Sequence, residues 1–136
     1  MRPLKVVMTV QAFTLLAFGL PYLLVPAIAV EVAGQLPVPE PFLLRATGAA
    51  FIMLAWIEFL VARDLVRHWP LVLAYTTLPA VSCVTIVLHY ATRGFVGEAW
   101  FWWTHAAVSG ILLVALLTAR HAAARGREDD IPDEPD

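Results

Sequence analysis

The chain has 136 residues, of which 60% are hydrophobic and only 15% are charged. Soluble domains are nearer 45–50% apolar and about 25% charged, and the length leaves no room for a second large domain. The apolar residues form four long blocks, a pattern that is typical of membrane-spanning helices. We therefore expect a lipid bilayer around the protein, and we expect no nucleic-acid partner.

The charged residues are unevenly distributed. The formal net charge is −2, yet six of the 11 acids lie in the segment 128–136, so that 5 acids stand against 9 basic residues in the remainder. The body of the chain is thus net positive by 4. A single cysteine, Cys83, cannot form an internal disulfide. We interpret it as a small buried apolar side chain.

The first apolar block covers residues 6–30 and predicts a membrane-spanning helix. Pro21 and Pro26 lack the amide hydrogen and should loosen its last turns. A cleaved secretory signal is the alternative, because the segment 27–29 resembles a signal cleavage site. Signal cores are usually about 7–15 residues long, shorter than this block, and we favour a retained helix.

The second block, residues 42–62, follows a proline-rich loop over 31–41 and is long enough to cross a bilayer as one helix. It carries Arg45 and Glu58. Charges inside such a segment are costly and usually face protein or water, so we place this helix on the inside of a bundle. Small residues recur every seven positions along it and favour close helix packing: Gly48, Ala55 and Ala62.

Two more helices are predicted over about 70–90 and 98–119, each after a short turn. Residues 1–122 then form one domain with four transmembrane helices, and the polar segment 123–136 forms a disordered tail. The predicted fold class is all-α, an integral membrane antiparallel four-helix bundle with a disordered acidic C-terminal tail.

The lysines and arginines predict the orientation of these helices. Arg45 and Arg93 fall on one side of the membrane, and the other basic residues fall on the opposite side. Because positive residues concentrate on the cytoplasmic side, both termini are predicted to be cytoplasmic. The cytoplasmic set contains seven residues: Arg2, Lys5, Arg63, Arg67, Arg120, Arg125 and Arg127.

This topology collects polar residues at the outer end of the bundle. Arg45, His89 and His105 should lie there, with Thr85 and Ser109 one turn deeper than the two histidines. We treat the five as candidate ligand-binding residues. The histidines could simply hydrogen-bond, could line a pocket for a small molecule or lipid headgroup, or could ligate haem or a metal. Zinc would normally need more protein ligands than two, so no metal site is predicted.

Arg45 and Glu58 are unsuitable as an ion pair, because thirteen residues of helix separate them by about 20 Å. Arg45 should instead meet Glu31 or Glu40 from the preceding loop, or an anionic ligand at the outer surface.

Glu58 and Gln11 are candidate buried polar residues near the inner end. They should lie at similar depth, and a hydrogen bond between them would lessen the cost of burying the carboxyl group. Three interpretations of Glu58 remain open. It could clamp two helices together, extend towards Arg63 and the headgroups, or handle protons, as intramembrane carboxyl groups often do.

The segment 25–64 shows four features in succession: a first helix that ends in proline, a Gly-x-x-Pro-like loop, an Arg-x-x-Gly entry to the second helix and an Ala-Arg-Asp exit. It resembles small bacterial four-helix membrane proteins that are broadly DoxX-like. The resemblance implies four helices in a bacterial inner membrane. DoxX itself is associated with a quinone-linked oxidoreductase complex, and no residue here transfers a catalytic role.

The sequence contains no phosphate-binding glycine loop, CxxC, HExxH or nucleophile elbow. We therefore expect a non-catalytic membrane protein, an accessory subunit or interaction partner of a membrane complex, or a self-associating one. The alternative is a binder or carrier of a lipid-like or quinone-like molecule that uses Arg45, His89 and His105. A haem or metal redox protein that uses the two histidines is the third possibility. No catalytic residue and no cofactor is predicted.

Overall fold

A computed structural model describes residues 1–34, 41–94 and 99–128 of the chain. These residues form five α-helices and no strand, and four of the helices are long and apolar enough to cross a membrane. The all-α prediction and the number of long apolar helices are thereby confirmed. The helices are α1 (Arg2–Leu24), α2 (Pro26–Val32), α3 (Pro41–Arg63), α4 (Trp69–Arg93) and α5 (Ala99–Glu128).

The first apolar block contains a break that separates α1 from α2. Val25 leaves the helical conformation (φ −135°, ψ 56°), and Pro26 becomes the first residue of α2. A proline disfavours helical geometry in the residue before it and suits the first position of a new helix. Pro21, which was also expected to loosen the helix, stays inside α1. The block predicted as one helix over 6–30 is therefore a long helix followed by a separate short one.

The last helix is longer than the sequence predicted. We expected it to end near residue 119, but α5 continues to Glu128. Three consecutive alanines, 122–124, are strong helix formers, and Ala123 is buried in the core. The beginning of the segment predicted as a disordered tail is thus helical, and residues 129–136 lie outside the described part of the chain.

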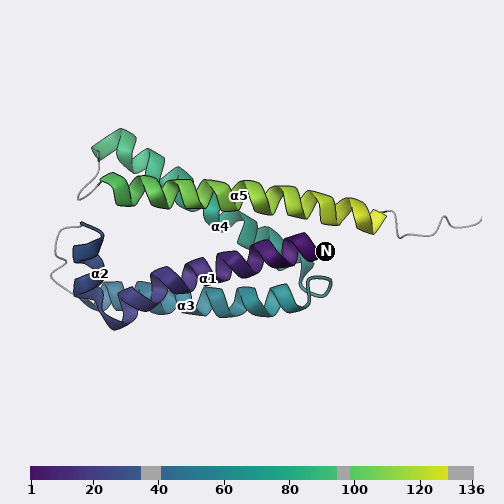
Figure 1. Cartoon of the computed structure of the whole chain (residues 1–136), viewed down its shortest axis with the longest axis horizontal. Coiled ribbons are helices and arrows are strands. Elements are labelled where there is room, and N and C mark those ends of the chain that lie inside the picture. Colours follow the sequence, from purple (N-terminus) through teal and green to yellow (C-terminus); the bar gives the residue numbers. More distant parts are fainter. Residues whose placement is uncertain (35–40, 95–98, 129–136) are drawn as a thin grey trace, which may run out of the picture.

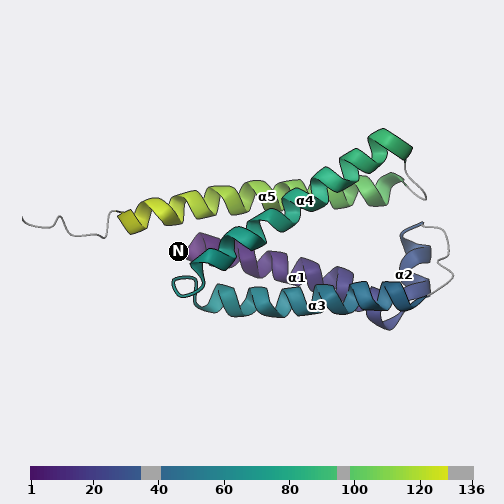
Figure 2. The same ribbon diagram turned by 180° about the vertical axis from the view of Figure 1, so that it is seen from behind.

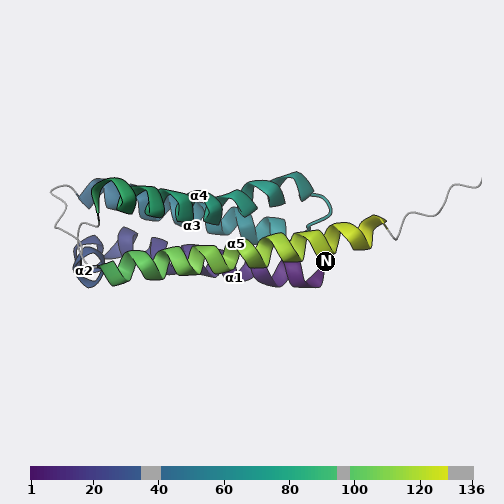
Figure 3. The ribbon, with the colours of Figure 1, turned by 90° about the horizontal axis from the view of Figure 1, so that it is seen from above.

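The four long helices form two layers. In Figure 1, α4 and α5 form one layer and α1 and α3 form the other. Seen from above, α5 covers α1 and α4 covers α3 (Figure 3). The N-terminus and the end of α5 lie at the same end of the molecule, here called the terminal end (Figure 1).

The contact between α1 and α3 is the most extensive one between the described helices. A Cβ atom on Gly48 would lie 2.6 Å from the carbonyl oxygen of Gly19 and 2.6 Å from the amide nitrogen of Leu23. No real side chain tolerates such distances from backbone atoms, so the two helices meet through their glycines. Near the other end of the contact, Phe13 and Phe59 pack edge to face with ring centroids 5.2 Å apart.

The hydrophobic core lies at the terminal end, where all four long helices meet. From there α4 diverges from α3 towards the opposite end, as Figure 2 shows. The helix bundle is therefore filled with side chains at one end and is less closely packed at the other. The core residues are Leu4, Met8, Val61, Ala62, Leu65, Val72, Tyr75, Leu116, Ala119 and Ala123.

Gly48 and Gly110 differ in their surroundings, and the comparison yields a prediction. Gly48→Ala should lower the free energy of unfolding by about 1–3 kcal/mol, because the added methyl group meets backbone that cannot move aside. Gly110→Ala should leave stability unchanged or raise it by up to about 1 kcal/mol, because no atom lies within 4 Å of its added Cβ. Thermal unfolding of both variants in detergent measures the difference. Equal effects would contradict the glycine contact between α1 and α3.

Candidate functional site

Two adjoining cavities open where the helix layers separate. The first, the serine cavity, has a volume of about 290 Å³ and is lined by side chains from α1, α3, α4 and α5. The second, the aromatic cavity, has a volume of about 430 Å³ and lies between α1, α2 and α5. Phe18 and His105 line both, so the two cavities adjoin, and together they are called the cleft here. Volumes of this order are typical of small-molecule sites.

The described lining of the cleft is mainly apolar. Among the residues that the structure describes, no lysine, arginine, aspartate or glutamate lines either cavity. Such a site excludes the phosphate of a phospholipid headgroup, because burying an ion without a counter-charge is costly. The polar side chains of the serine cavity are Gln11, Thr14, Thr77, Ser82, His105 and Ser109.

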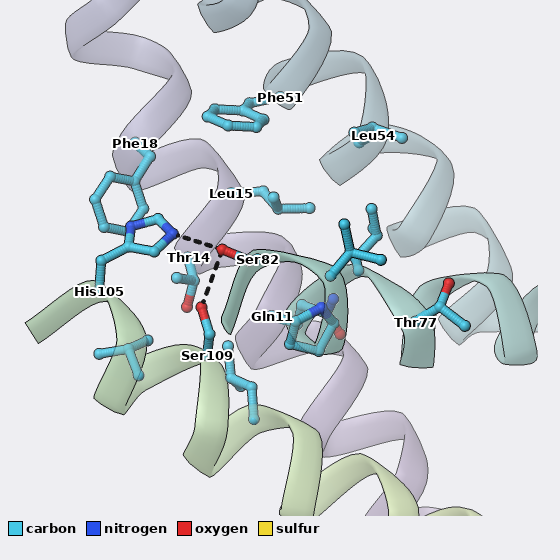
Figure 4. A pocket seen from close by; sticks show the side chains of 15 residues that line it. Gln11, Thr14, Leu15, Phe18, Phe51, Leu54, Thr77, Ser82, His105 and Ser109 are labelled. Atoms are coloured by element: carbon cyan, nitrogen blue, oxygen red, sulfur yellow. Dashed lines mark hydrogen bonds between the residues drawn. The ribbon is translucent and has the colours of Figure 1, made fainter. Parts of the chain in front are cut away.

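Three of these polar side chains form a hydrogen-bonded chain, which Figure 4 shows. The hydroxyl oxygen of Ser82 lies 2.9 Å from Nε2 of His105, and the hydroxyl of Ser109 donates to Ser82 over 3.4 Å. His105 and Ser109 are four residues apart and share one face of α5, which packs against α4. The His105 ring also contacts the ring of Phe18, at a centroid distance of 4.8 Å.

The two threonines of the serine cavity use their hydroxyl hydrogens within their own helices. Thr14 donates to the carbonyl oxygen of Val10 at 3.0 Å, and Thr77 donates to that of Ala74 at 2.6 Å. This bond to the preceding turn is common for threonine in helices. The polar hydrogens of the serine cavity that could serve a ligand therefore belong to the chain of Ser82, His105 and Ser109 and to the amide of Gln11.

Gln11 joins α1 to α4 at the edge of the serine cavity. Its side chain is 3% exposed, and Nε2 donates to the carbonyl oxygen of Tyr75 at 3.1 Å. The hydroxyl of Tyr75 in turn donates to the carbonyl oxygen of Leu54 on α3, at 3.0 Å. Oε1 of Gln11 has no hydrogen-bond partner in the described part of the chain. One buried acceptor of this side chain is thus unsatisfied.

Glu58 is fully buried on α3, at 0% exposure, and lines neither cavity. Both of its carboxyl oxygens lack a hydrogen-bond partner among the described residues. The Gln11–Glu58 hydrogen bond expected from the sequence is not present, since neither Glu58 oxygen has a partner; the Gln11 amide donates to the carbonyl oxygen of Tyr75. Burial of an unpartnered polar group costs stability, and Glu58 therefore weakens the fold.

The structure brings together only some of the predicted ligand-binding residues. His105 and Ser109 line the serine cavity, whereas Arg45, Thr85 and His89 are exposed and line neither cavity. No group of three or more His, Cys, Asp or Glu side chains suitable for a metal occurs in the residues the structure describes.

The partner proposed for Arg45 was a loop glutamate. No ion pair joins Arg45 to Glu31 in the structure, and Glu40 lies outside the described residues.

Sequence reasoning missed Phe18 and gave Ser82 no role of its own. In the sequence, Ser82 precedes His89 by seven residues and so continues the helix face of His89 inward. Its spacing of seven from His89 says nothing about which α5 residue it meets, because that depends on the crossing of α4 and α5. The sequence signal for the site is therefore a polar residue in mid-helix rather than a motif.

Glu58 yields a stability prediction. Glu58→Met keeps an unbranched side chain and removes the unpartnered oxygens, so the free energy of unfolding should rise by about 1–3 kcal/mol. Glu58→Gln retains polar atoms at the same place and should not give this gain. Thermal unfolding in detergent measures both. A destabilised Met variant beside an unaffected Gln variant would mean that the carboxyl group has a partner after all.

Comparisons with known proteins add no assignment to this geometry. No protein-family model matches the chain, and no curated protein or solved structure does so significantly. The DoxX-like resemblance of the segment 25–64 therefore stays a prediction from its sequence features. The chemistry of the cleft is the remaining guide to function.

Proposed function

We propose that this protein is a multi-pass membrane protein that binds a neutral amphiphilic molecule, lipid-like or quinone-like, in the cleft between its helix layers. The observation that carries the proposal is the uncharged, apolar cavity with a hydrogen-bonded chain of Ser82, His105 and Ser109 on its wall. A site of this kind offers apolar surface to a chain or ring and a few polar atoms to a head.

The apolar outer surface supports a position in the membrane. Large hydrophobic side chains on α1, α2, α3 and α5 are more than half exposed, which is unfavourable in water when they are so numerous. Lipid would cover them at no such cost. The most exposed are Phe42 at 71%, Ile111 at 69%, Val32 at 68%, and Leu24 and Trp56 at 67%.

The distribution of basic residues supports the orientation. With the terminal end in the cytoplasm of a bacterial inner membrane, the four long helices cross as an antiparallel bundle, and both termini are cytoplasmic. The cleft then opens in the outer half of the membrane. A hydrophobic ligand could enter it from the lipid rather than from water.

The binding proposal differs from our first expectation of an accessory subunit. That expectation depended on a lack of catalytic motifs, whereas the cleft is a positive feature with a defined lining. The two are compatible, because a protein that holds a lipid-soluble molecule can serve a larger membrane complex. A partner complex and self-association remain predictions from the sequence, and a bound haem remains the third possibility considered there.

The orientation leads to a labelling prediction. In a Cys83→Ala background, Glu31→Cys should react with a membrane-impermeant maleimide on intact cells, because residue 31 is exposed in the last turn of α2, at the proposed outer end. Arg67→Cys, in the turn between α3 and α4, should react only after the cells are permeabilised. Labelling of both in intact cells, or of Arg67→Cys alone, would refute the orientation.

Ligand binding leads to a second prediction, which compares two valines on α5. Val108 lines the serine cavity, whereas Val114 is 62% exposed on the outer surface. Val108→Phe should fill the cavity and reduce binding about tenfold or more, since overpacking costs on the order of 1–3 kcal/mol. Val114→Phe should bind like the wild type.

Native mass spectrometry can measure this after incubation with neutral and anionic lipid fractions. Wild type and Val114→Phe should retain a species from the neutral fraction only. Retention by Val108→Phe at the wild-type level would place the ligand outside the cleft. Retention of anionic lipid in preference to neutral lipid would overturn the proposed ligand class.

A further inference from the structure

We propose that Gln11 and Pro79 act as one unit: Gln11 of α1 supplies the hydrogen bond that Pro79 removes from α4, and this bond holds the wall of the serine cavity in place. Both residues line that cavity. The bond itself is independent of any ligand, whereas its consequence for ligand binding rests on the proposed function.

Pro79 leaves one carbonyl group of α4 without its usual helical partner. A proline inside a helix has no amide hydrogen, so the carbonyl oxygen four residues earlier loses its bond. Pro79 lies inside α4, and the oxygen affected is that of Tyr75. Tyr75 is 5% exposed, and a buried carbonyl oxygen without a donor costs stability. The position therefore calls for a donor from outside the backbone of α4.

Gln11 supplies that donor. Its Nε2 donates to the Tyr75 carbonyl oxygen at 3.1 Å, so that the side chain reaches from α1 to α4 (Figure 4). The side chain is 3% exposed, and water has little access to compete for the bond. In membrane proteins, groups on neighbouring helices can satisfy the carbonyl oxygens that prolines free. Gln11 and Pro79 match this arrangement.

The partners of α4 change at the same place. Before Pro79, the Tyr75 hydroxyl donates to the carbonyl oxygen of Leu54 on α3 at 3.0 Å. After Pro79, the next polar side chain is Ser82, which is bonded to His105 of α5. Residues on both sides of Pro79 line the serine cavity. The bond from α1 thus holds α4 at the point where its partners change from α1 and α3 to α5, and so sets the position of the cavity wall.

A double-mutant cycle tests whether the Gln11 bond depends on Pro79. Gln11→Met keeps an unbranched side chain and removes the donor. It should lower Tm by about 3–12 °C, as expected for one buried carbonyl group left without a donor. In a Pro79→Ala background the amide of residue 79 can bond the Tyr75 oxygen, and the same change should lower Tm by less than half as much. Thermal unfolding of the full-length proteins in detergent measures all four.

Tyr75→Phe is the matched control. It removes the bond from the Tyr75 hydroxyl to Leu54, which does not involve the carbonyl group freed by Pro79. Its effect on Tm should be the same in both backgrounds. Equal effects of Gln11→Met in both backgrounds would overturn the proposal, because the bond to Tyr75 would then be an ordinary contact between helices. A dependence on residue 79 that is as large for Tyr75→Phe would overturn it too.

The test does not depend on the folding of one variant. Pro79→Leu also restores the amide and serves if Pro79→Ala does not fold. In the wild-type protein, nitrogen-15 labelling of glutamine gives two side-chain amides, those of Gln11 and Gln35. By NMR, one of them should exchange its hydrogens slowly with solvent, as a buried bonded amide does. Two rapidly exchanging amides would contradict the bond.

Ligand binding separates this proposal from the proposed function. Gln11→Met should retain less neutral lipid than the wild type in native mass spectrometry, and the addition of Pro79→Ala should recover part of the loss. Equal retention by all three proteins would mean that the unit does not set the cavity wall. If the Tm values are coupled but no form retains lipid, the proposed function fails while the bond between α1 and α4 stands.

Discussion

The direct packing of α1 on α3 constrains the rest of the molecule. At Gly19 and Gly48 the two backbones approach so closely that no side chain fits between them. In a membrane, where lipid is as apolar as the helices, such close van der Waals contact is a main source of helix association. The pair therefore forms a fixed base. Helices α4 and α5 pack onto this base through large apolar side chains and hydrogen bonds rather than through glycines.

The second helix pair meets this base mainly at the terminal end. Large apolar side chains fill the space there, among them Leu4, Met8 and Leu116, each fully buried. Hydrogen bonds from Gln11 to Tyr75 and from Tyr75 to Leu54 fix α4 against both helices of the base. Beyond these bonds α4 separates from α3 (Figure 2). The serine cavity is lined by both of these helices together with α1 and α5, whereas the aromatic cavity lies between α1, α2 and α5.

The buried polar atoms divide into two kinds with different consequences. Gln11 lines the serine cavity, and its amide already ties α1 to α4, so that only Oε1 is left without a partner among the described residues. Glu58 lines neither cavity, and both of its oxygens are buried without a partner among those residues. Full burial argues against the interpretation in which Glu58 extends towards Arg63 and the headgroups, and the unpartnered oxygens argue against a hydrogen-bonded clamp. Proton handling by Glu58 stays a prediction from the sequence.

The sequence by itself determined the helices. Long apolar blocks bounded by prolines and charges give four long helices. Over such a length without water, a single segment can satisfy the hydrogen bonds of its own backbone only as a helix. The burial of Gly48, Ala55 and Ala62 follows from their spacing on α3. Two helix boundaries were predicted wrongly from the sequence. Pro26 begins a separate helix, and α5 continues through the alanines of 122–124.

Only the tertiary structure decided which polar side chains meet. His89 and His105 look equivalent in the sequence, yet only His105 lines the cleft. Its hydrogen-bond partner on α4 is Ser82 rather than His89. The reason is geometric. Spacing along one helix fixes which residues share a face, whereas the crossing of two helices depends on side-chain packing along their whole contact, which no short segment of sequence contains.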